Sequence, residues 1–123
     1  MPWSEKSIAS ELDNPLSLWL VALSDEQVIG YVGSQCVMDE ADMMNIAVAE
    51  SFRRRGVARE LVNALVSALT SRHVRSLTLE VRASNEAAKS LYDAMGFRQV
   101  GRRPNYYSAP KEDALILRKE WQI

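Results

Sequence analysis

The stretch NIAVAESFRRRGVARELVNALVSAL, residues 45–69, joins a short β-type run, an arginine-rich turn and a strongly patterned helix without a spacer. The first backbone N–H groups of a helix lack partners within the helix, and the helix dipole places partial positive charge there. Gly56 lets a ligand approach the backbone closely, and Ala58 keeps the next close position small. Four arginines surround this point: Arg53, Arg54, Arg55 and Arg59. The stretch therefore predicts a pyrophosphate site at the start of a helix.

Size and composition favour one globular domain over residues 1–123. The chain has 123 residues, 47% of them hydrophobic, and a net charge of −1. This charge argues against a general nucleic-acid binder, which needs a broad basic face. No apolar run approaches the roughly 18 residues of a membrane span, and the N-terminus lacks the apolar core of a signal peptide.

Cysteine and histidine are too few for a disulfide or a metal site. Cys36 is the only cysteine and His73 the only histidine. A lone cysteine fits a reducing cytoplasm, which we predict as the location. Cys36 lies in an apolar stretch, so a buried structural thiol is favoured over a nucleophile. We expect no metal.

The first half of the chain predicts a helix followed by a meander of strands. Ser4 is a good N-cap for a helix, and residues 14–15, Asn-Pro, end it. Gly30 and Gly33 indicate a bulge or a close backbone approach within a strand. The predicted elements are a short helix over 2–12, a hairpin of strands 16–23 and 28–37 around the turn 24–27, and a third strand over 42–48.

The second half predicts a right-handed crossover. From residue 57 the apolar side chains recur with helical spacing, and residues 77–81 alternate as a strand does. A strand, helix, strand order makes the strand with Glu80 parallel to the one ending at Val48. Residues 84–86, Ser-Asn-Glu, cap a second helix over 87–95, which Gly96 ends. Two last strands, 97–102 and 114–119, flank a polar loop over 103–113.

The arginine turn resembles a known acetyl-CoA loop. The sequence contains neither GxxxxGK[ST] nor GxGxxG, so the common phosphate loops lack their fingerprints. Residues 53–58, Arg-Arg-Arg-Gly-Val-Ala, resemble the R/Q-x-x-G-x-G/A loop of the GCN5-related N-acetyltransferases (GNAT). The alternative is an ordinary basic turn before a helix.

Further motifs resemble one branch of that superfamily, the ribosomal-protein-alanine N-acetyltransferases (RimI-like). The matching pieces, in unbroken order from residue 2 to about 118, are PWS at 2–4, EVRASN at 80–85, LYDAMGF at 91–97, RPNYY at 103–107 and EDA at 112–114. The resemblance implies an α/β GNAT fold: a mixed, mostly antiparallel sheet of about six strands with a central, splayed parallel pair and helices on both faces. Members usually have a strand and helix ahead of the PWS segment, whereas this sequence begins with MPWS. Either the gene product is natively short or an N-terminal piece is absent. In both cases we expect an exposed sheet edge that favours self-association, as in a homodimer, or reduces stability.

The resemblance also implies the chemistry. It implies acetyl transfer from acetyl-CoA, by direct attack, to a protein N-terminal α-amine, in particular the N-terminal alanine of a small-subunit ribosomal protein. A backbone N–H near Val48 would stabilise developing oxyanion charge. The implied cofactor contacts are Ile46, Ala47 and Val48 for the pantetheine arm, Arg53, Arg54, Arg55, Gly56, Val57, Ala58 and Arg59 for the pyrophosphate, and Asn85.

Two residues match the catalytic positions of the branch. Glu80 resembles the general base; an α-amine with a pKa of about 7.7–8.0 must lose a proton before attack. The alternative is a solvent-facing strand residue paired with Arg82 or Arg98. Tyr92 resembles the general acid for the CoA thiolate, and it also fits a core aromatic on one helix face, a role compatible with the first.

The acceptor is the least determined part. Asp39, Glu40 and Asp42 form an acidic cluster that would attract a basic peptide, or they are only turn residues. Tyr106 and Tyr107 resemble the loop that lines the acceptor groove. Two alternatives remain open: acetylation of a lysine or a small polyamine, and a non-catalytic acyl-CoA-binding module.

Overall fold

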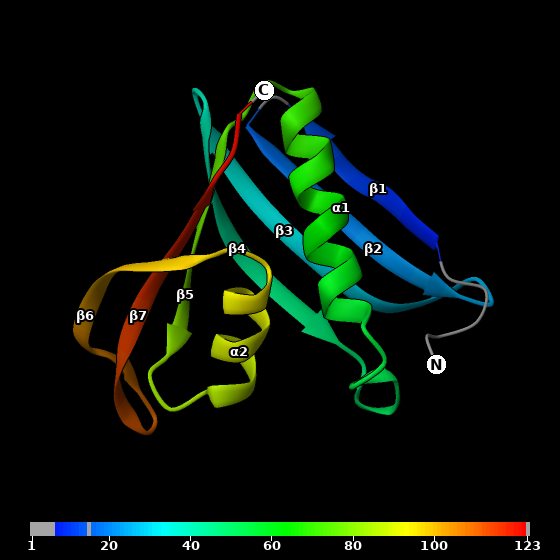
Figure 1. Cartoon of the computed structure of the whole chain (residues 1–123). Helices are drawn as coiled ribbons and strands as arrows, with labels where there is room; N and C mark the ends of the chain where they lie inside the picture. The colour runs from blue at the N-terminus through cyan, green and yellow to red at the C-terminus, as the bar shows by residue number, and fades with distance from the viewer. Residues whose placement is uncertain (1–6, 15, 123) are drawn as a thin grey trace.

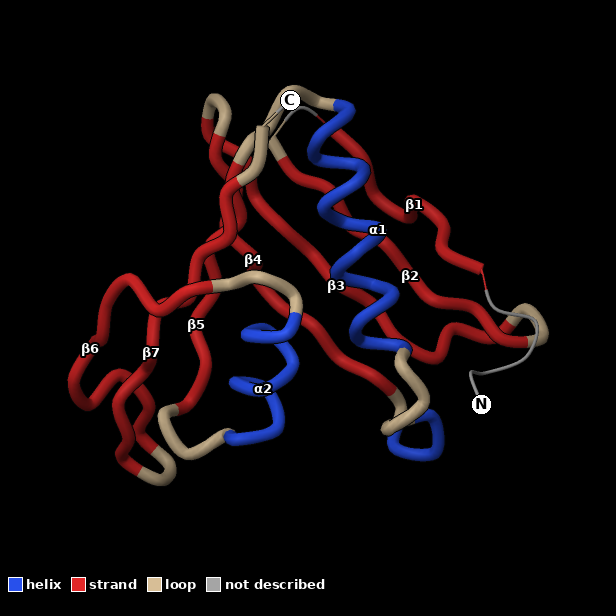
Figure 2. Tube along the Cα trace, viewed as in Figure 1, coloured by secondary structure: helices blue, strands red, loops and turns tan. Residues whose placement is uncertain are grey.

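The computed structural model describes residues 7–14 and 16–122, and the N-terminal side chains through residue 15 are not described. Over this part the chain forms seven strands, two α-helices and one short 3-10 helix (Figures 1 and 2). The strands are β1 (Ser7–Asn14), β2 (Ser17–Ser24), β3 (Gln27–Val37), β4 (Glu40–Val48), β5 (Ser76–Arg82), β6 (Arg98–Ser108) and β7 (Lys111–Glu120). The helices are η1 (Glu50–Phe52), α1 (Val57–Ser71) and α2 (Glu86–Ala94).

All strands join one mixed sheet in the order β1-β2-β3-β4-β5-β7-β6. Every pair is antiparallel except β4 and β5, which run parallel as the crossover predicted. The predicted hairpin turn is confirmed: Asp25 and Glu26 both have positive φ, which suits the tight turn between β2 and β3. The sheet has seven strands where about six were expected.

Both α-helices pack on the same face of the sheet, which corrects the prediction of helices on both faces. A Cβ on Gly30 would meet Leu61 of α1 at 3.3 Å, so this side of β3 faces α1. Gly30 and Ser34 share that side, and Ser34 pairs with Met43 of β4. The hydroxyl of Tyr92 in α2 meets the Met43 sulfur, which places α2 on the same side. Figure 1 shows both helices in front of the sheet.

Two segments differ from the sequence prediction. The helix predicted over residues 2–12 is wrong for residues 7–12, which belong to β1 and pair with β2; its expected cap Ser4 lies outside the described residues. The loop predicted over 103–113 is largely strand, because β6 and β7 pair as far as Ser108 and Lys111, with an irregular register between Arg103 and Tyr107. In both places, pairing with a distant strand overrides local sequence preference.

A single core cluster joins the two helices to the sheet. It includes Leu61, Leu65 and Leu69 of α1 and Tyr92 of α2. Gly33 accounts for one close approach, since a Cβ there would lie 2.4 Å from the Trp19 ring on the opposite face. The buried face of α1 fixes the position of its N-terminus, where the predicted anion site lies. Within the described ranges, no helix is long and apolar enough to cross a membrane.

Candidate active site

The turn before α1 exposes the backbone N–H groups of the first helical turn. Glu60 donates the first intrahelical bond, to the Gly56 carbonyl at 3.0 Å, so the three N–H groups before it are free of that ladder. Gly56 has φ 82° and Arg54 has φ 64°. Left-handed residues within a turn direct neighbouring N–H groups toward one side, which makes an anion-binding concavity. The predicted strand, turn and helix arrangement is therefore present.

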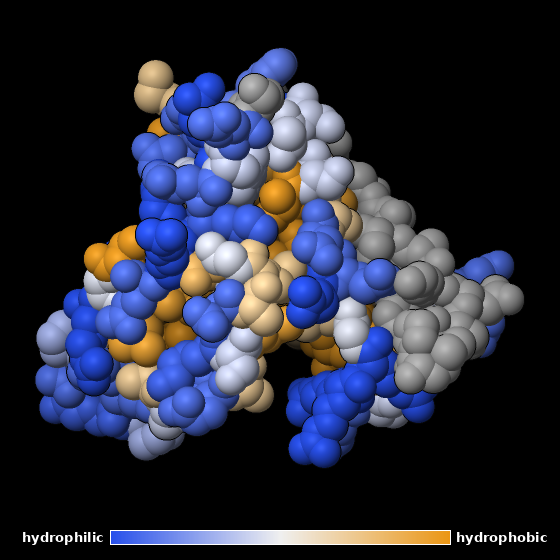
Figure 3. All heavy atoms as spheres, viewed as in Figure 1, coloured by the Kyte–Doolittle hydropathy of each residue, from blue (hydrophilic) through white to orange (hydrophobic). Residues whose placement is uncertain are grey.

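A cavity of about 690 Å³ opens in front of this turn. It lies between β4, the N-terminus of α1 and one side of α2. Figure 3 shows the molecule hollowed between α2 and the turn before α1, with apolar atoms toward the floor. The predicted cofactor residues that line it are Ile46, Ala47, Val48, Arg53, Arg54, Gly56, Val57, Ala58, Arg59 and Asn85. Arg55 is not among them: its guanidinium lies 5.3 Å from the centre of the Phe52 ring.

The parallel strands β4 and β5 separate beside this cavity. Their ladder includes only Glu40–Asp42 with Ser76–Thr78. Among the described residues, none pairs with the rest of β4 on this side, so residues 46–48 present an open strand edge. In Figure 1 the two strands diverge toward the bottom of the view, with α2 in front of the gap.

A second cavity of about 460 Å³ lies on the other side of the separation. Glu80 and Val81 of β5, Met43 and Met44 of β4, and Tyr107 of β6 are among its walls. The two cavities share four lining residues: Ile46, Asn85, Ala88 and Tyr92. The site is therefore two chambers that meet at the splay.

Glu80 points to the second chamber from the middle of β5. Strand alternation directs Leu79 and Val81 to the core and Glu80 to the opposite face. Its Oε2 lies 3.4 Å from Nε of Arg103, with 29% of the Glu80 side chain exposed. The expected partners Arg82 and Arg98 do not hold it; the ion pair forms with Arg103 because β6 runs beside β7 across from β5.

Tyr92 lies where the chambers meet and is only 4% exposed. Its ring packs edge-on against Phe97 at 5.3 Å, and its hydroxyl approaches the Met43 sulfur at 4.0 Å. Burial raises the pKa of Tyr92 to about 12. The predicted core position is therefore confirmed, and the hydroxyl of this packed ring, which keeps its proton at neutral pH, lies at a cavity wall.

Asn85 fixes the start of α2 beside both chambers. Its side-chain oxygen accepts a hydrogen bond from the Ala88 N–H at 3.0 Å, which confirms the predicted N-cap. The end of α2 is also as predicted, with Gly96 at φ 92°. The cap holds the wall that carries Ala88 and Tyr92.

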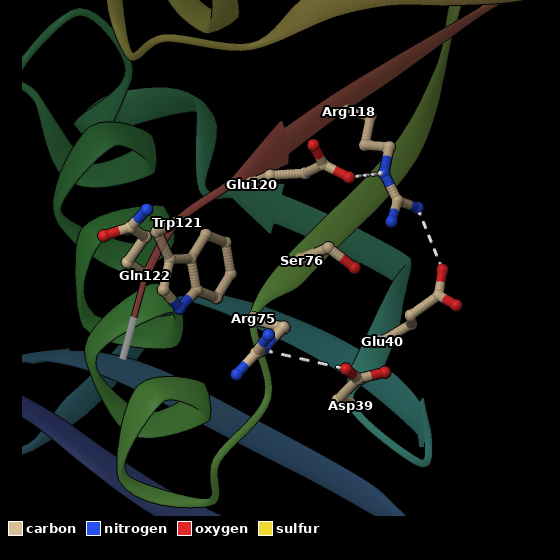
Figure 4. A pocket seen from close by; sticks show the side chains of 8 residues that line it. All are labelled: Asp39, Glu40, Arg75, Ser76, Arg118, Glu120, Trp121 and Gln122. Atoms are coloured by element: carbon tan, nitrogen blue, oxygen red, sulfur yellow. Dashed lines mark hydrogen bonds and ion pairs between the residues drawn. The ribbon is translucent and has the colours of Figure 1, made fainter.

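The acidic cluster lies apart from the two chambers. Figure 4 shows Asp39 and Glu40 at a different pocket, near the start of β5. Asp39 pairs with Arg75 at 3.7 Å, and Glu40 pairs with Arg118 at 3.0 Å. Glu40 is level with Ser76, four positions before Glu80 along β5. Asp42 is exposed and lies level with Thr78.

The sequence itself matches the Acetyltransferase (GNAT) family over residues 1–97, most of the chain. The chain belongs to the GNAT acetyltransferase family. One GNAT relative is the [ribosomal protein bS18]-alanine N-acetyltransferase of Salmonella typhimurium, which is 43% identical over 94% of this chain and 79% of its own length. This similarity confirms the branch that the sequence motifs indicated.

Solved GNAT structures have the same fold. The ribosomal-protein-S18-alanine N-acetyltransferase from Escherichia coli matches with a TM-score of 0.90 and 28% identity, over 96% of this chain and 95% of that one. A GNAT acetyltransferase from Elizabethkingia anophelis with acetyl-CoA bound matches with a TM-score of 0.85 and 17% identity, over 96% and 99% of the two chains. The predicted fold class is confirmed.

Several cavity residues of this GNAT chain were not identified from the sequence. Phe52, Leu91 and Met43 line the chambers but read as ordinary core positions. The sequence pattern predicted a loop at Arg103, whose guanidinium lies near Glu80 in the structure. Arg82 had a signal, because it belongs to the EVR motif, but its partners come from the distant β6 to β7 hairpin.

Proposed function

We propose that this protein transfers the acetyl group of acetyl-CoA to the N-terminal α-amine of a protein, an alanine at the N-terminus of a ribosomal protein. One observation carries the proposal: an anion-binding helix start, an open strand edge, a carboxylate and a buried phenol converge on two chambers that meet at the splay. The name of the Salmonella relative supports the acceptor.

The first chamber fits acetyl-CoA by its donors and its shape. The free N–H groups at the start of α1, with Arg53, Arg54 and Arg59, would hold the pyrophosphate. The open edge at residues 46–48 would pair with the amides of the pantetheine arm, as a further strand would. Acetyl-CoA, when bound, supplies the activated acetyl thioester.

Glu80 would act as the base. An α-amine has a pKa of about 7.7–8.0, so most of it carries a proton at neutral pH and cannot attack. The Glu80 carboxylate lies in the wall of the second chamber and would accept that proton directly or through a water. Its ion pair with Arg103 is exposed on the arginine side and contributes little, so the acceptor's ammonium can replace Arg103 there.

Tyr92 would act as the acid. Burial raises its pKa to about 12, so the hydroxyl keeps its proton throughout the physiological range. Its place at the junction of the chambers suits donation of that proton to the leaving sulfur. The Met43 sulfur that the hydroxyl meets is a weak acceptor, which leaves the proton available.

The proposal includes the setting of the enzyme. A ribosomal acceptor places the protein in the cytoplasm. We also propose that it forms a homodimer, because β1 is an edge of the sheet formed by the described strands and Val37 is 70% exposed on the face that carries no helix of the described chain.

The test is release of CoA thiol from acetyl-CoA with a short basic peptide that begins with a free alanine. The matched peptide is N-blocked and carries an internal lysine. We expect turnover with the free α-amine alone, and a fall of about a hundredfold or more in kcat for Glu80→Gln, because the amide cannot accept the proton. Glu120→Gln, an exposed carboxylate on β7, serves as the control with the same change of charge.

Other outcomes point elsewhere. Turnover only with the lysine peptide would reassign the enzyme to side-chain amines. A rise in melting temperature with acetyl-CoA, but no turnover on either peptide or on a polyamine, would identify a non-catalytic acyl-CoA-binding module.

A further inference from the structure

The Glu112 carboxylate bridges two parts of the chain that are far apart in sequence. From the start of β7, its Oε2 accepts the backbone N–H of Ser84 at 2.6 Å, in the turn between β5 and α2. Its Oε1 accepts a hydrogen bond from Nη1 of Arg82 at 3.3 Å. The Glu112 side chain is 16% exposed, and it lines neither chamber.

Arg82 extends this connection to the tip of the hairpin. Its Nη1 donates to the Pro110 carbonyl at 3.1 Å, and its Nη2 donates to the Ala109 carbonyl at 3.5 Å. The guanidinium also lies over the Tyr107 ring, 4.3 Å from the ring centre. A planar guanidinium can make all these contacts together, whereas an ammonium cannot.

Tyr107, like its neighbour Tyr106, is a residue of the hairpin that lines the second chamber. Glu80 lines the same chamber, and Tyr107 pairs with Glu112 in the ladder between β6 and β7. The backbone beside it is irregular, since the register shifts between Arg103 and Tyr107. The ladder is therefore interrupted beside this wall. The side-chain contacts of Arg82 and Glu112 reinforce the connection to β5, which also includes the hydrogen bond from the Ala83 N–H to the Asp113 carbonyl and the ion pair between Glu80 and Arg103.

We propose that Glu112 and Arg82 are positioning residues that fasten the β6 to β7 hairpin to β5 and so hold Tyr107 as a wall of the acceptor chamber. Glu112 lines neither chamber and acts through two contacts, the Arg82 guanidinium and the backbone N–H of Ser84. The expected effect on acceptor binding rests on the proposed function. The fastening of the hairpin does not, because it exists in the free protein.

The carboxylate is well suited to the task at neutral pH. The hydrogen bond from Ser84 and the bond from Arg82 hold the pKa of Glu112 below its usual range. A charged acceptor makes a stronger bond to an N–H than a neutral one does. Glu112→Gln keeps the shape and removes the charge, so it weakens the fastening without opening a cavity.

The kinetic test compares Glu112→Gln with wild type and with Glu120→Gln, the same change at the far end of the same strand. We expect the KM for the alanine peptide to rise about tenfold in Glu112→Gln, with a smaller change in kcat and no change in acetyl-CoA affinity. Glu120→Gln should leave all three unchanged. Tyr107→Leu should raise KM as Glu112→Gln does, and Tyr107→Phe, which keeps the ring under Arg82, should not.

A double-mutant cycle tests the route through Arg82. Because the two residues share one connection, Arg82→Met with Glu112→Gln should raise KM by clearly less than the product of the two single effects. Additive effects would contradict that route. An unchanged KM in Glu112→Gln, or equal losses of acceptor and acetyl-CoA binding, would overturn the proposal, since the second result indicates general unfolding.

A third readout needs no activity. Amide hydrogen exchange by NMR should speed up at Ser84 and Tyr107 in Glu112→Gln, and not at α1. Failure of the wild type to acetylate any peptide would refute the proposed function alone, and unchanged exchange at Ser84 and Tyr107 would refute the fastening alone.

Discussion

At the scale of single residues, Glu80 and Tyr92 both line the second chamber but lie in opposite environments. Glu80 is 29% exposed and its ion-pair partner Arg103 is 58% exposed, which would suit the proposed base that meets a solvated amine. Tyr92 is 4% exposed and held by packing against Phe97, as an acid that must stay protonated and fixed should be. Motif matching identified both positions, but only the fold supplies Arg103 as the Glu80 partner.

Removal of the Tyr92 hydroxyl tests its proposed role. Tyr92→Phe keeps the ring against Phe97, so we expect the melting temperature to change little. Loss of the proton donor should lower kcat about a hundredfold with the acetyl-CoA affinity unchanged. Steady-state kinetics measures kcat, and equilibrium binding measures the acetyl-CoA affinity, so the two experiments separate a loss of catalysis from a loss of cofactor binding. Wild-type kcat in the variant would assign Tyr92 to packing alone.

The same phenol predicts a dependence of stability on alkaline pH. The pKa of Tyr92 is about 12 in the folded protein, and about 10 for an exposed tyrosine in the unfolded chain. Between these values the unfolded state binds fewer protons, so the free energy of unfolding falls as pH rises. The shift corresponds to a loss of about 2 to 3 kcal/mol between pH 10 and 12.

Denaturant unfolding between pH 9 and 12 measures this loss. The measured total also includes a contribution from Tyr107, whose pKa burial also raises. Tyr92→Phe should therefore lose less stability than wild type over this range while remaining similar at pH 8. Parallel curves for the two proteins would show that the buried phenol does not titrate as described.

At the scale of elements, the start of α1 combines a local and a tertiary property. The free N–H groups follow from any helix start, but their direction into the chamber depends on the burial of Leu61, Leu65 and Leu69 against the sheet. The turn before α1 requires a left-handed backbone conformation at Gly56. A Cβ at this position would have no neighbour within 4 Å. Strain rather than crowding therefore limits this position.

Gly56→Ala tests the turn against a matched position. Alanine at positive φ costs about 1 kcal/mol, so we expect a modest loss of stability and weaker acetyl-CoA binding. Gly96→Ala provides the control, because Gly96 has φ 92° at the end of α2, outside the lining of the first chamber. It should lose similar stability and keep its acetyl-CoA affinity. Isothermal titration with acetyl-CoA measures the affinity of each variant. Equal affinities in the two variants would contradict a cofactor site at the start of α1.

At the scale of the whole molecule, one splayed pair of strands organises the function. The short ladder between β4 and β5 leaves room for two chambers, and both helices lie on the face that walls them. The other face carries no helix of the described chain, and Trp19 and Tyr31 lie partly buried there with their rings 6.2 Å apart. An edge strand and an exposed apolar residue on this face favour self-association.

Sedimentation over a range of concentrations tests the homodimer. We expect the mass to rise from that of the 13.8 kDa chain toward twice that value. Val37→Lys, at a 70% exposed position on the face without helices, should weaken the association with kcat unchanged. A single 13.8 kDa species at every concentration would contradict the dimer.

The sequence by itself determined the features that depend on near neighbours along the chain. The helical spacing of α1, the alternation around Glu80, the Asn85 cap and the glycines at helix ends were all predicted, because each is set by residues within one or two turns. The order of strand, helix and strand determined the parallel pair through handedness.

Only the tertiary structure decided what distant segments do to one another. Residues 7–12 carry helical signals but form β1, because β2 offers a strand to pair with. The pairing of β6 with β7 turned a polar loop into strand and brought Arg103 to Glu80 and Glu112 to Ser84. Such contacts depend on the shape of the whole sheet and have no local pattern, so the chain order alone does not determine them.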